Sequence, residues 1–384
     1  MDYVKLLSDL VAIDTTVPPG DNYLKALGFL EPFFAATGCS AEIISIPPEH
    51  AEGREGRAAL ICHRRRPGRP RLIFYAHVDV VPACGWDAFT PRLENGRLYG
   101  RGAADMKGGI VSLLLALDAL KGRTLKYDVS VMITTDEEYS QASQLHFLRQ
   151  FMEPVRGASL FSLDSNFGAV AVAGLGALQL DIKVKGKSVH SGLSHLGVNA
   201  VEQSHQIMTA LFDLKEKVTR RQSRVATSPD TGLSFMAPRL NINMIHGGLK
   251  VNIVPDECII SIDRRLIPEE SLEEAESEIM GSLRAVQGVD WEVSRGLRIP
   301  TLPPAAGPVV DELAAVIKKV TGNTGKYGEM GSGDLSIIAH RDWQATEFGL
   351  GVIRTECNIH GRDEFVYLKD VLDLSRIIVQ FLQE

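Results

Sequence analysis

The feature that most constrains this fold is an alternation of strand-like and helix-like segments along the first part of the chain. Apolar, β-branched runs at residues 41–46, 58–62, 71–77, 127–135 and 158–164 are interleaved with helical patterns at residues 22–38, 106–122 and 143–152. This alternation predicts an α/β fold with a mostly parallel central sheet and helices on both faces. In such sheets functional residues collect beyond the carboxyl ends of the strands.

The pattern changes near residue 176. Residues 176–188 alternate apolar and polar side chains, as an antiparallel strand with one solvated face does. A helix, two strands and a second helix follow, which together predict a small α+β layer. Because 384 residues exceed the size at which one core keeps growing, we expect two domains. The larger one would comprise residues 1–175 and 294–384, interrupted by a smaller one at residues 176–293.

Composition excludes several classes of protein. A net charge of −7 argues against a generic binder of nucleic acid or of anionic membranes. The one basic run, HRRRPGRPR at residues 63–71, lies between two strand-like runs and predicts a solvated hairpin tip. No apolar stretch approaches the length of a membrane span, and the first residues lack the apolar core of a signal peptide. Five widely spaced cysteines without a CxxC suggest no disulfide framework, so we expect a cytoplasmic protein.

Polar residues stand where the predicted strands end. His77 and Asp79 close an apolar run, and alternate residues of a strand point to the same face. They are either a satisfied buried pair or a metal ligand with the carboxylate that orients it. Asp105 lies in a Gly-rich segment just ahead of a helix, where an N-cap role is the alternative to metal ligation.

Further carboxylates follow the later strands. Asp136, Glu137 and Glu138 repel one another unless a cation or solvent offsets their charge, and a solvated helix start is the alternative. Asp164 ends another strand, and His360 lies in a turn near the C-terminus. Imidazoles and carboxylates without cysteine suit zinc, cobalt or manganese. One carboxylate can bridge two ions about 3.5–4 Å apart, as in two-metal hydrolases.

Longer motifs surround these residues. They are YAHVDVVP, GRLYGRGAADMKGG, TTDEE, GKSVHSGLSHLGVNA, VNIVPDE, GSGDLS and CNIHGRDE. Together they resemble the acetylornithine deacetylase / succinyl-diaminopimelate desuccinylase family, which also includes aminoacylases, carboxypeptidases and dipeptidases that use one or two zinc ions. The resemblance implies an α/β catalytic domain interrupted by a small α+β lid that also forms a homodimer.

The resemblance also implies a ligand set for two zinc ions, with cobalt or manganese as possible substitutes. His77 and Asp164 would hold one ion, Glu138 and His360 the other, and Asp105 would bridge the two.

The same resemblance assigns the remaining roles by matching positions. Asp79 would orient His77, and Glu137 would be the general base. His190 of the lid would reach the partner subunit's active site and stabilise the oxyanion there. Arg265 would bind the substrate's free carboxylate, with Asn252 and Gly333 as further substrate contacts.

Two departures from the family pattern bear on the substrate. The segment after the paired glutamates reads YSQASQ, where the family is usually Gly-rich. Asp164 stands in LDSN, where deacylases usually carry Glu-Pro, and an Asp there resembles the peptidase branches. Because the motif set as a whole resembles the deacetylase/desuccinylase group, we expect a zinc-dependent hydrolase of small N-acyl amino acids. Asp164 favours the alternative, a dipeptidase or carboxypeptidase. A non-catalytic binding protein on this fold would be expected to lack a ligand or the base, yet His77, Asp105, Glu137, Glu138, Asp164 and His360 are all present.

Overall fold

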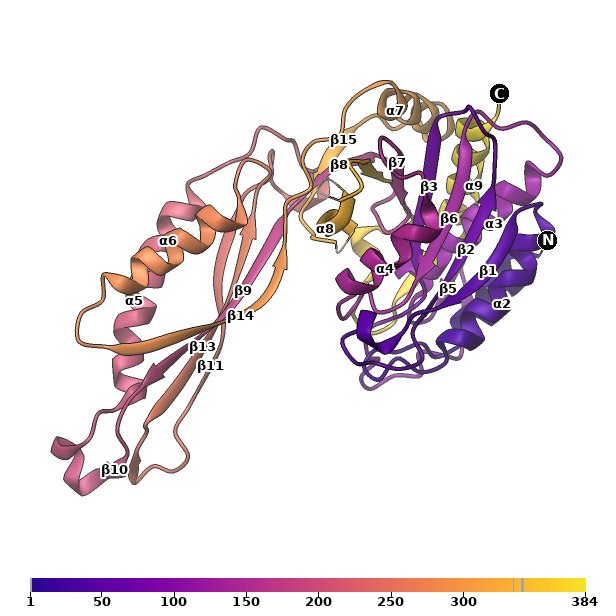
Figure 1. Ribbon diagram of the computed structural model, residues 1–384. Helices are drawn as coiled ribbons and strands as arrows, with labels where there is room; N and C mark the ends of the chain where they lie inside the picture. The colour runs from indigo at the N-terminus through magenta and orange to yellow at the C-terminus, as the bar shows by residue number, and fades with distance from the viewer. Residues whose placement is uncertain (1, 334, 340–341) are drawn as a thin grey trace. The chain divides into compact units, whose positions relative to one another are not determined.

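The computed structural model describes residues 2–333, 335–339 and 342–384, and the chain divides into two compact units (Figure 1). The larger unit combines Met1–Val172, Ala305–Tyr327 and Gly333–Glu384. The inserted unit combines Ala173–Pro304 with Gly328–Ser332. Each unit has its own sheet and its own apolar core.

The main sheet of the larger unit has eight strands in the order β1-β2-β6-β3-β7-β16-β8-β15. Their bounds are β1 Ser40–Ser45, β2 Ala58–Arg64, β3 Arg71–His77, β6 Asp128–Thr134, β7 Ser159–Ser162, β8 Val170–Gly174, β15 Lys326–Glu329 and β16 Thr346–Gly349. The neighbours β6, β3, β7 and β16 run parallel, whereas β1–β2, β2–β6 and β16–β8 are antiparallel. The predicted α/β fold is confirmed, and the four central strands β6, β3, β7 and β16 form a parallel core.

Helices cover both faces of this sheet (Figure 1). Their bounds are α1 Tyr3–Val11, α2 Tyr23–Ala36, α3 Gly108–Ala119, α4 Ala142–Met152, α7 Pro308–Thr321, α8 Leu335–Ala339 and α9 Leu368–Leu382. On one face, Leu145 of α4 and Ile338 of α8 pack with Ile73 and Met132 of the strands. On the other face, the Phe161 ring of β7 meets the Phe381 ring of α9. The alternation of strand side chains between two helical layers explains why these strands are apolar on both faces.

The basic segment after β2 is not the tip of a hairpin, and that prediction is wrong. Strand β6 lies between β2 and β3 in the sheet. All seven residues of β3 are buried, so this strand needs a hydrogen-bonded neighbour on each edge, and it pairs in parallel with β6 and β7. The arginines bond to the chain rather than only to solvent: Arg64 donates to the carbonyls of Leu120 and Arg123.

A small three-stranded sheet, β17-β5-β4, completes the larger unit. Its strands are β4 Arg92–Glu94, β5 Arg97–Tyr99 and β17 Phe365–Tyr367. In the chain, β5 is followed by a single π-helical turn, η2 Ala103–Lys107, that leads into α3. The C-terminal strand β17 is thus paired with β5, which precedes the Asp105 turn in the chain.

The inserted unit is built on a four-stranded antiparallel sheet in the order β11-β13-β9-β14. Its strands are β9 Gly176–Lys185, β11 Arg239–Gly247, β13 Glu257–Leu266 and β14 Asp290–Ile299, and its helices are α5 Ala200–Thr219 and α6 Leu272–Arg284. Asn199 and Ser271 cap the first turns of the two helices with side-chain oxygens. Ile207 and Ile279 of the helices pack on Leu180 and Ile260 of the sheet.

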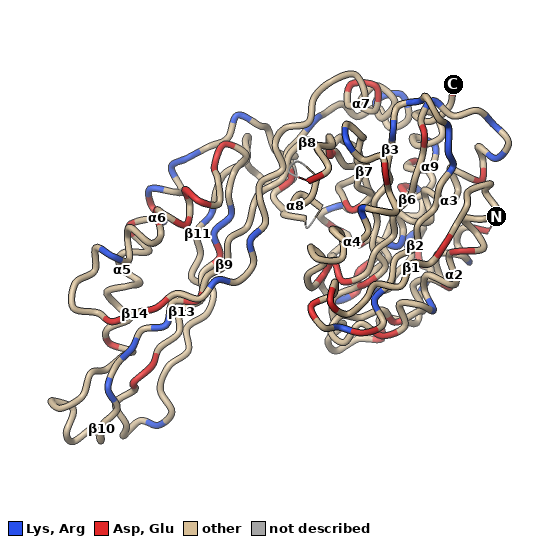
Figure 2. Tube along the Cα trace, in the orientation of Figure 1, with Lys and Arg blue, Asp and Glu red and all other residues tan. Residues whose placement is uncertain are grey.

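Acidic and basic residues are interspersed along both units (Figure 2). Within the described residues, no helix is long and apolar enough to cross a membrane.

Candidate metal centre and active site

The site is assembled at one edge of the main sheet, where parallel strands end. Strand β3 ends at His77, β6 ends at Thr134 and β7 ends at Ser162. Since the carboxyl ends of parallel strands meet at the same edge, the segments that follow lie together. They bring with them Asp79, Glu137, Glu138 and Asp164.

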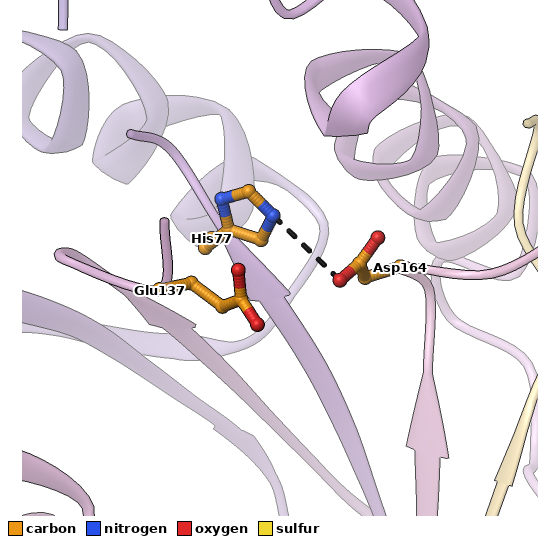
Figure 3. A group of neighbouring side chains, drawn as sticks. All are labelled: His77, Glu137 and Asp164. Atoms are coloured by element: carbon orange, nitrogen blue, oxygen red, sulfur yellow. Dashed lines mark ion pairs between the residues drawn. The ribbon is translucent and has the colours of Figure 1, made fainter. Parts of the chain in front are cut away.

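The first group of candidate ligands consists of His77, Glu137 and Asp164 (Figure 3). One ligand atom of each lies within 4.8 Å of the others. The Nε2 atom of His77 is 3.8 Å from Oδ2 of Asp164. His77 is fully buried, and among the described residues its Nε2 has no hydrogen-bond partner.

The second group consists of Asp105, Glu138 and His360. The Nε2 atom of His360 lies 3.1 Å from Oδ2 of Asp105 and 3.2 Å from Oε1 of Glu138. His360 is more than half exposed, whereas the two carboxylates are mostly buried. The group therefore opens to solvent on the imidazole side.

Asp105 faces both groups. Its Oδ1 is 3.4 Å from Nε2 of His77, and its Oδ2 is 3.1 Å from Nε2 of His360. Because α3 begins at Gly108, Asp105 is not the N-cap of that helix, which was the alternative to ligation. One carboxylate placed between two imidazoles is the arrangement that a bridging ligand requires.

Asp79 contacts one residue of each group, His77 and Glu138. Its Oδ1 lies 3.5 Å from Nδ1 of His77, and its Oδ2 accepts the backbone N–H of Glu138 at 2.9 Å. The Nδ1 atom of His77 also lies 3.1 Å from the carbonyl oxygen of Asp79. These contacts fix the ring so that Nε2 points into the site, as expected of a carboxylate that orients a ligating histidine.

The electrostatics of this cluster suit a cation. Burial alone would lower the pKa of His77, but the carboxylates of Asp105 and Asp79 outweigh it and raise that pKa well above the ordinary value. The carboxylates of Asp105 and Glu138 raise the pKa of His360 to about 10. Burial raises the pKa of Glu138, against the opposing effect of His360.

The donor set itself fits metal ions. Five carboxylates and two imidazoles converge here, and the buried Nε2 of His77 is left without a hydrogen bond among the described residues. Oxygen and imidazole nitrogen are donors that zinc, cobalt and manganese accept. A cation would therefore offset the carboxylate charge and satisfy the orphaned nitrogen together.

The surroundings of two buried acids beside this site, Glu364 and Asp136, were not predicted from the sequence. Glu364 accepts the backbone N–H groups of Ala104 and Asp105 at 3.1 and 3.2 Å, and pairs with Arg101 at 2.6 Å. Asp136, the first of the three adjacent acids, is fully buried against arginines rather than forming a solvated helix start. The signal available for Glu364 was its position four residues after His360, next to an apolar strand.

Three further predicted residues, His190, Asn252 and Arg265, lie in the inserted unit. His190 and Asn252 are exposed in the inserted unit, at one end of the short ladder between β10 Val189–His190 and β12 Ile253–Val254. His190 pairs there with Ile253, and Asn252 directly precedes Ile253 in the chain. Arg265 is partly exposed at the end of β13, and Arg264, next to it, is buried with Glu270.

The Arg265 guanidinium is held by two neighbours. Its Nε donates to Oδ1 of Asp263 at 2.8 Å, and its Nη1 donates to Oγ of Ser332 at 3.0 Å. Gly333 directly follows Ser332 in the chain. The seven residues from His77 to His360 described above thus form one cluster in the larger unit, while His190, Asn252 and Arg265 belong to the inserted unit.

Comparison with known proteins identifies the family. Residues 73–384 match the model of peptidase family M20/M25/M40. A succinyl-diaminopimelate desuccinylase of Thioalkalivibrio sulfidiphilus is 31% identical, over 83% of this chain and 85% of the relative. An acetylornithine deacetylase of Vibrio campbellii is 30% identical, over 72% of this chain and 70% of the relative.

The fold has solved counterparts as well. The crystal structure of an M20 family metallo-carboxypeptidase from Sulfolobus solfataricus superposes with a TM-score of 0.82 at 15% identity, covering 99% of this chain and 98% of that one. The resemblance drawn from the sequence motifs is thereby confirmed. The chain belongs to peptidase family M20/M25/M40, a family of enzymes that hydrolyse amide bonds.

Proposed function

We propose that this chain is a zinc-dependent hydrolase that cleaves the amide bond of small N-acyl amino acids. The observation that carries the proposal is Asp105, whose two oxygens face the imidazoles of two separate ligand groups. His77 and Asp164 would hold one ion, Glu138 and His360 the other, and Asp105 would be shared. When bound, two divalent ions would lower the pKa of the attacking water and polarise the scissile carbonyl.

Glu137 is the proton carrier in this proposal. Its carboxylate lies beside His77 and Asp164 without being needed to complete the shared arrangement around Asp105. As general base it accepts a proton from the attacking water, and as general acid it delivers that proton to the leaving amine. Asp79 keeps the His77 ring oriented throughout.

The substrate class rests on the relatives and on Arg265. Both curated relatives cited above are named for removal of an acyl group. A guanidinium can bind a free carboxylate through two parallel hydrogen bonds, and Arg265 is partly exposed and held in place by Asp263 and Ser332. Asn252 and Gly333 are proposed as further substrate contacts.

The second candidate is a dipeptidase or carboxypeptidase. The specific observation in its favour is Asp164, an aspartate where the motif of deacylases usually carries Glu-Pro. Both reactions break an amide bond by attack of water, so the same residues would serve either substrate.

We also propose that the active form is a cytoplasmic homodimer, formed through the inserted unit. That unit exposes several large apolar side chains around His190: Leu193, Leu196, Leu249 and Val251. Exposed apolar patches of this kind commonly mark interaction sites. His190 would then stabilise the oxyanion in the partner subunit's site. All five cysteines are free thiols, as suits a reducing compartment.

Hydrolysis assays over a substrate panel test this function. The zinc-loaded protein should cleave acetylated or succinylated amino acids, and a chelator should abolish the cleavage. Cleavage of dipeptides alone would establish the peptidase alternative instead. If the metal-bound protein cleaved no compound of the panel, the proposed hydrolase function would be refuted.

A substitution at Glu137 tests the assigned base. Glu137→Gln keeps the size of the side chain but cannot accept the proton, so we expect kcat to fall about 10³-fold, within the usual range for general-base removal. Metal content should remain near that of the wild type. The control is Glu55→Gln, a change at an exposed glutamate. Undiminished turnover in the Glu137→Gln variant would remove this residue from the mechanism.

A further inference from the structure

We infer that Asp136 is a positioning residue, a buried anchor that aims Glu137 and Glu138 at their separate tasks. It stands directly before them in the chain, yet it belongs to neither ligand group. Its side chain is fully buried and turned into the protein interior. The inference rests on the proposed function of those two glutamates.

Four side chains converge on the Asp136 carboxylate, three of them from segments far away in the sequence. The Tyr23 hydroxyl donates to Oδ1 at 2.7 Å. On Oδ2, Arg57 Nε donates at 2.8 Å and Gln144 Nε2 at 3.0 Å, while Arg54 Nε lies at an ion-pair distance of 2.9 Å. A buried carboxylate is tolerated when it is paired and its oxygens are satisfied, and here both conditions are met.

This pairing offsets the charge repulsion expected among the three adjacent acids. The guanidinium groups of Arg54 and Arg57 offset the charge of Asp136. Glu137 and Glu138 remain partly accessible and face the candidate metal groups. The three acids are thus divided between two environments, one closed by arginines and one suited to metal ions.

The backbone at Asp136 makes this division possible. Its φ of 66° lies in the left-handed region, which a non-glycine residue occupies only where the surroundings hold it. The carbonyl of Asp136 accepts the N–H groups of Tyr139 and Ser140 at 3.2 and 2.9 Å, closing a turn over the two glutamates. The N–H of Glu138 is held separately by Asp79.

The segment YSQASQ, which departs from the Gly-rich family pattern, contributes to the anchor. Gln144 lies in the first turn of α4 and bonds to Asp136. Gln141, just before that helix, bonds to the hydroxyl of Tyr75, which is buried in β3 two residues before His77. The segment that follows the turn is therefore held by two side-chain contacts, where glycines would leave the backbone free.

The expected consequence is a loss of catalytic geometry when the anchor is loosened. A shift of about 1 Å in a reacting group can cost about 10²-fold in rate. Weakening the anchor should therefore lower kcat while leaving KM nearly unchanged, because neither Tyr23 nor Gln144 lies in the proposed ligand or substrate set. Displacement of Glu138 should also weaken metal binding.

Tyr23→Phe, Gln144→Leu and the double variant test this inference. Each removes one hydrogen bond to Asp136 with little change in size. The matched control is Tyr127→Phe, because the Tyr127 hydroxyl donates to a glutamate, Glu312, at 3.1 Å outside the site. The readouts are kcat, KM, the melting temperature, and the affinity for cobalt(II) titrated into the metal-free protein and followed by visible absorption.

We expect the double variant to lose about 30-fold in kcat and about tenfold in cobalt affinity, in the range for outer-shell changes at metal sites. Tyr127→Phe should lower only the melting temperature. If Tyr23→Phe and the double variant match that control, with kcat and cobalt affinity intact, the anchor inference is wrong. A wild-type protein that binds cobalt but hydrolyses nothing would instead refute the proposed function, and the cobalt titration would still test the anchor. Asp136→Asn is the more severe variant, and Tyr23→Phe stays decisive if it fails to fold.

Discussion

At the scale of single residues, one side-chain type performs four tasks in this protein because its surroundings differ. Asp79 orients an imidazole, Asp105 faces two imidazoles, Asp164 lies beside His77, and Asp136 is closed off by arginines. The tasks follow from partners within about 4 Å rather than from the carboxylate itself. A substitution at each aspartate should therefore have its own distinct effect.

Glu364 makes this argument testable. Its Oε1 accepts the N–H groups of Ala104 and Asp105, and its Oε2 pairs with Arg101, so both oxygens are used. Glu364→Gln keeps the shape but turns an NH₂ group toward one of these donors. Breaking such a buried pair costs about 3–5 kcal/mol of unfolding free energy. Metal affinity should fall about tenfold or more, because the Asp105 turn loses its support.

Urea unfolding and a cobalt titration measure both effects. Glu312→Gln is the control, since Glu312 also pairs with a cation, Lys126, but at the surface. Unchanged cobalt affinity in Glu364→Gln, despite a lower stability, would show that this residue supports the fold and not the site.

The clustering of the proposed ligand residues could be predicted because their sequence signals are local. His77, the paired glutamates and Asp164 each follow an apolar strand, and the motifs around them are long. The partners of Asp136 could not be predicted in this way, since Tyr23, Arg54 and Arg57 are joined to it only by the three-dimensional fold. Contacts between positions about 80 to 110 residues apart leave no periodic trace in one sequence.

At the scale of elements, the central strands were predicted closely and their order was not. Strand β3 has the predicted bounds, because all seven of its residues are buried and residues 72–76 form an unbroken apolar run. The position of β6 between β2 and β3 depends on pairing across the sheet, which neighbouring sequence does not encode. Strand β14 of the inserted unit was not predicted, since polar residues and Gly296 interrupt its pattern.

His63, near the end of β2, is expected to make the folded protein less stable at acid pH. Burial, together with the charges of Arg65 and Arg71, lowers the pKa of His63 to about 4. This folded-state pKa lies below the value near 6.5 expected for an unfolded chain. The neutral ring therefore contributes stability that is fully present above pH 6.5 and is lost as the pH falls toward 4.

Urea unfolding of the metal-free protein at about pH 7 and about pH 4.5 measures this loss. Wild type should lose roughly 1–2 kcal/mol more than His63→Asn over that interval, a figure discounted for partial exposure of the ring. Asparagine does not titrate, but it can keep a hydrogen bond to Ser130, which lies opposite His63 on the neighbouring strand β6. Equal losses in the two proteins would mean that His63 is not the group responsible.

At the scale of the whole molecule, the residues assigned to catalysis are divided between two units. The proposed metal ligands and Glu137 lie in the larger unit, and His190 lies in the inserted one. The exposed apolar side chains near His190 are where the proposed contact with a second copy of the chain would form. If each active site takes His190 from the partner subunit, a dimer contains two composite sites.

Mixing two inactive variants tests this arrangement. His190→Ala and Glu137→Ala homodimers should each be nearly inactive, one lacking the oxyanion donor and the other lacking the base. After subunit exchange, a heterodimer would contain one site with both residues intact and one with neither. Since about half the dimers in an equimolar mixture are heterodimers, each with one intact site of two, activity should return to about a quarter of the wild-type value.

The control for this mixture is a pair of variants on the same unit. Glu137→Ala mixed with His360→Ala affects two residues that both belong to the larger unit. No heterodimer of that pair gains an intact site by sharing His190, because each larger unit keeps its own lesion. Recovery in the His190 mixture alone would establish a shared site. No recovery in either mixture, despite exchange verified by light scattering and mass spectrometry, would show that His190 acts within its own chain or not at all.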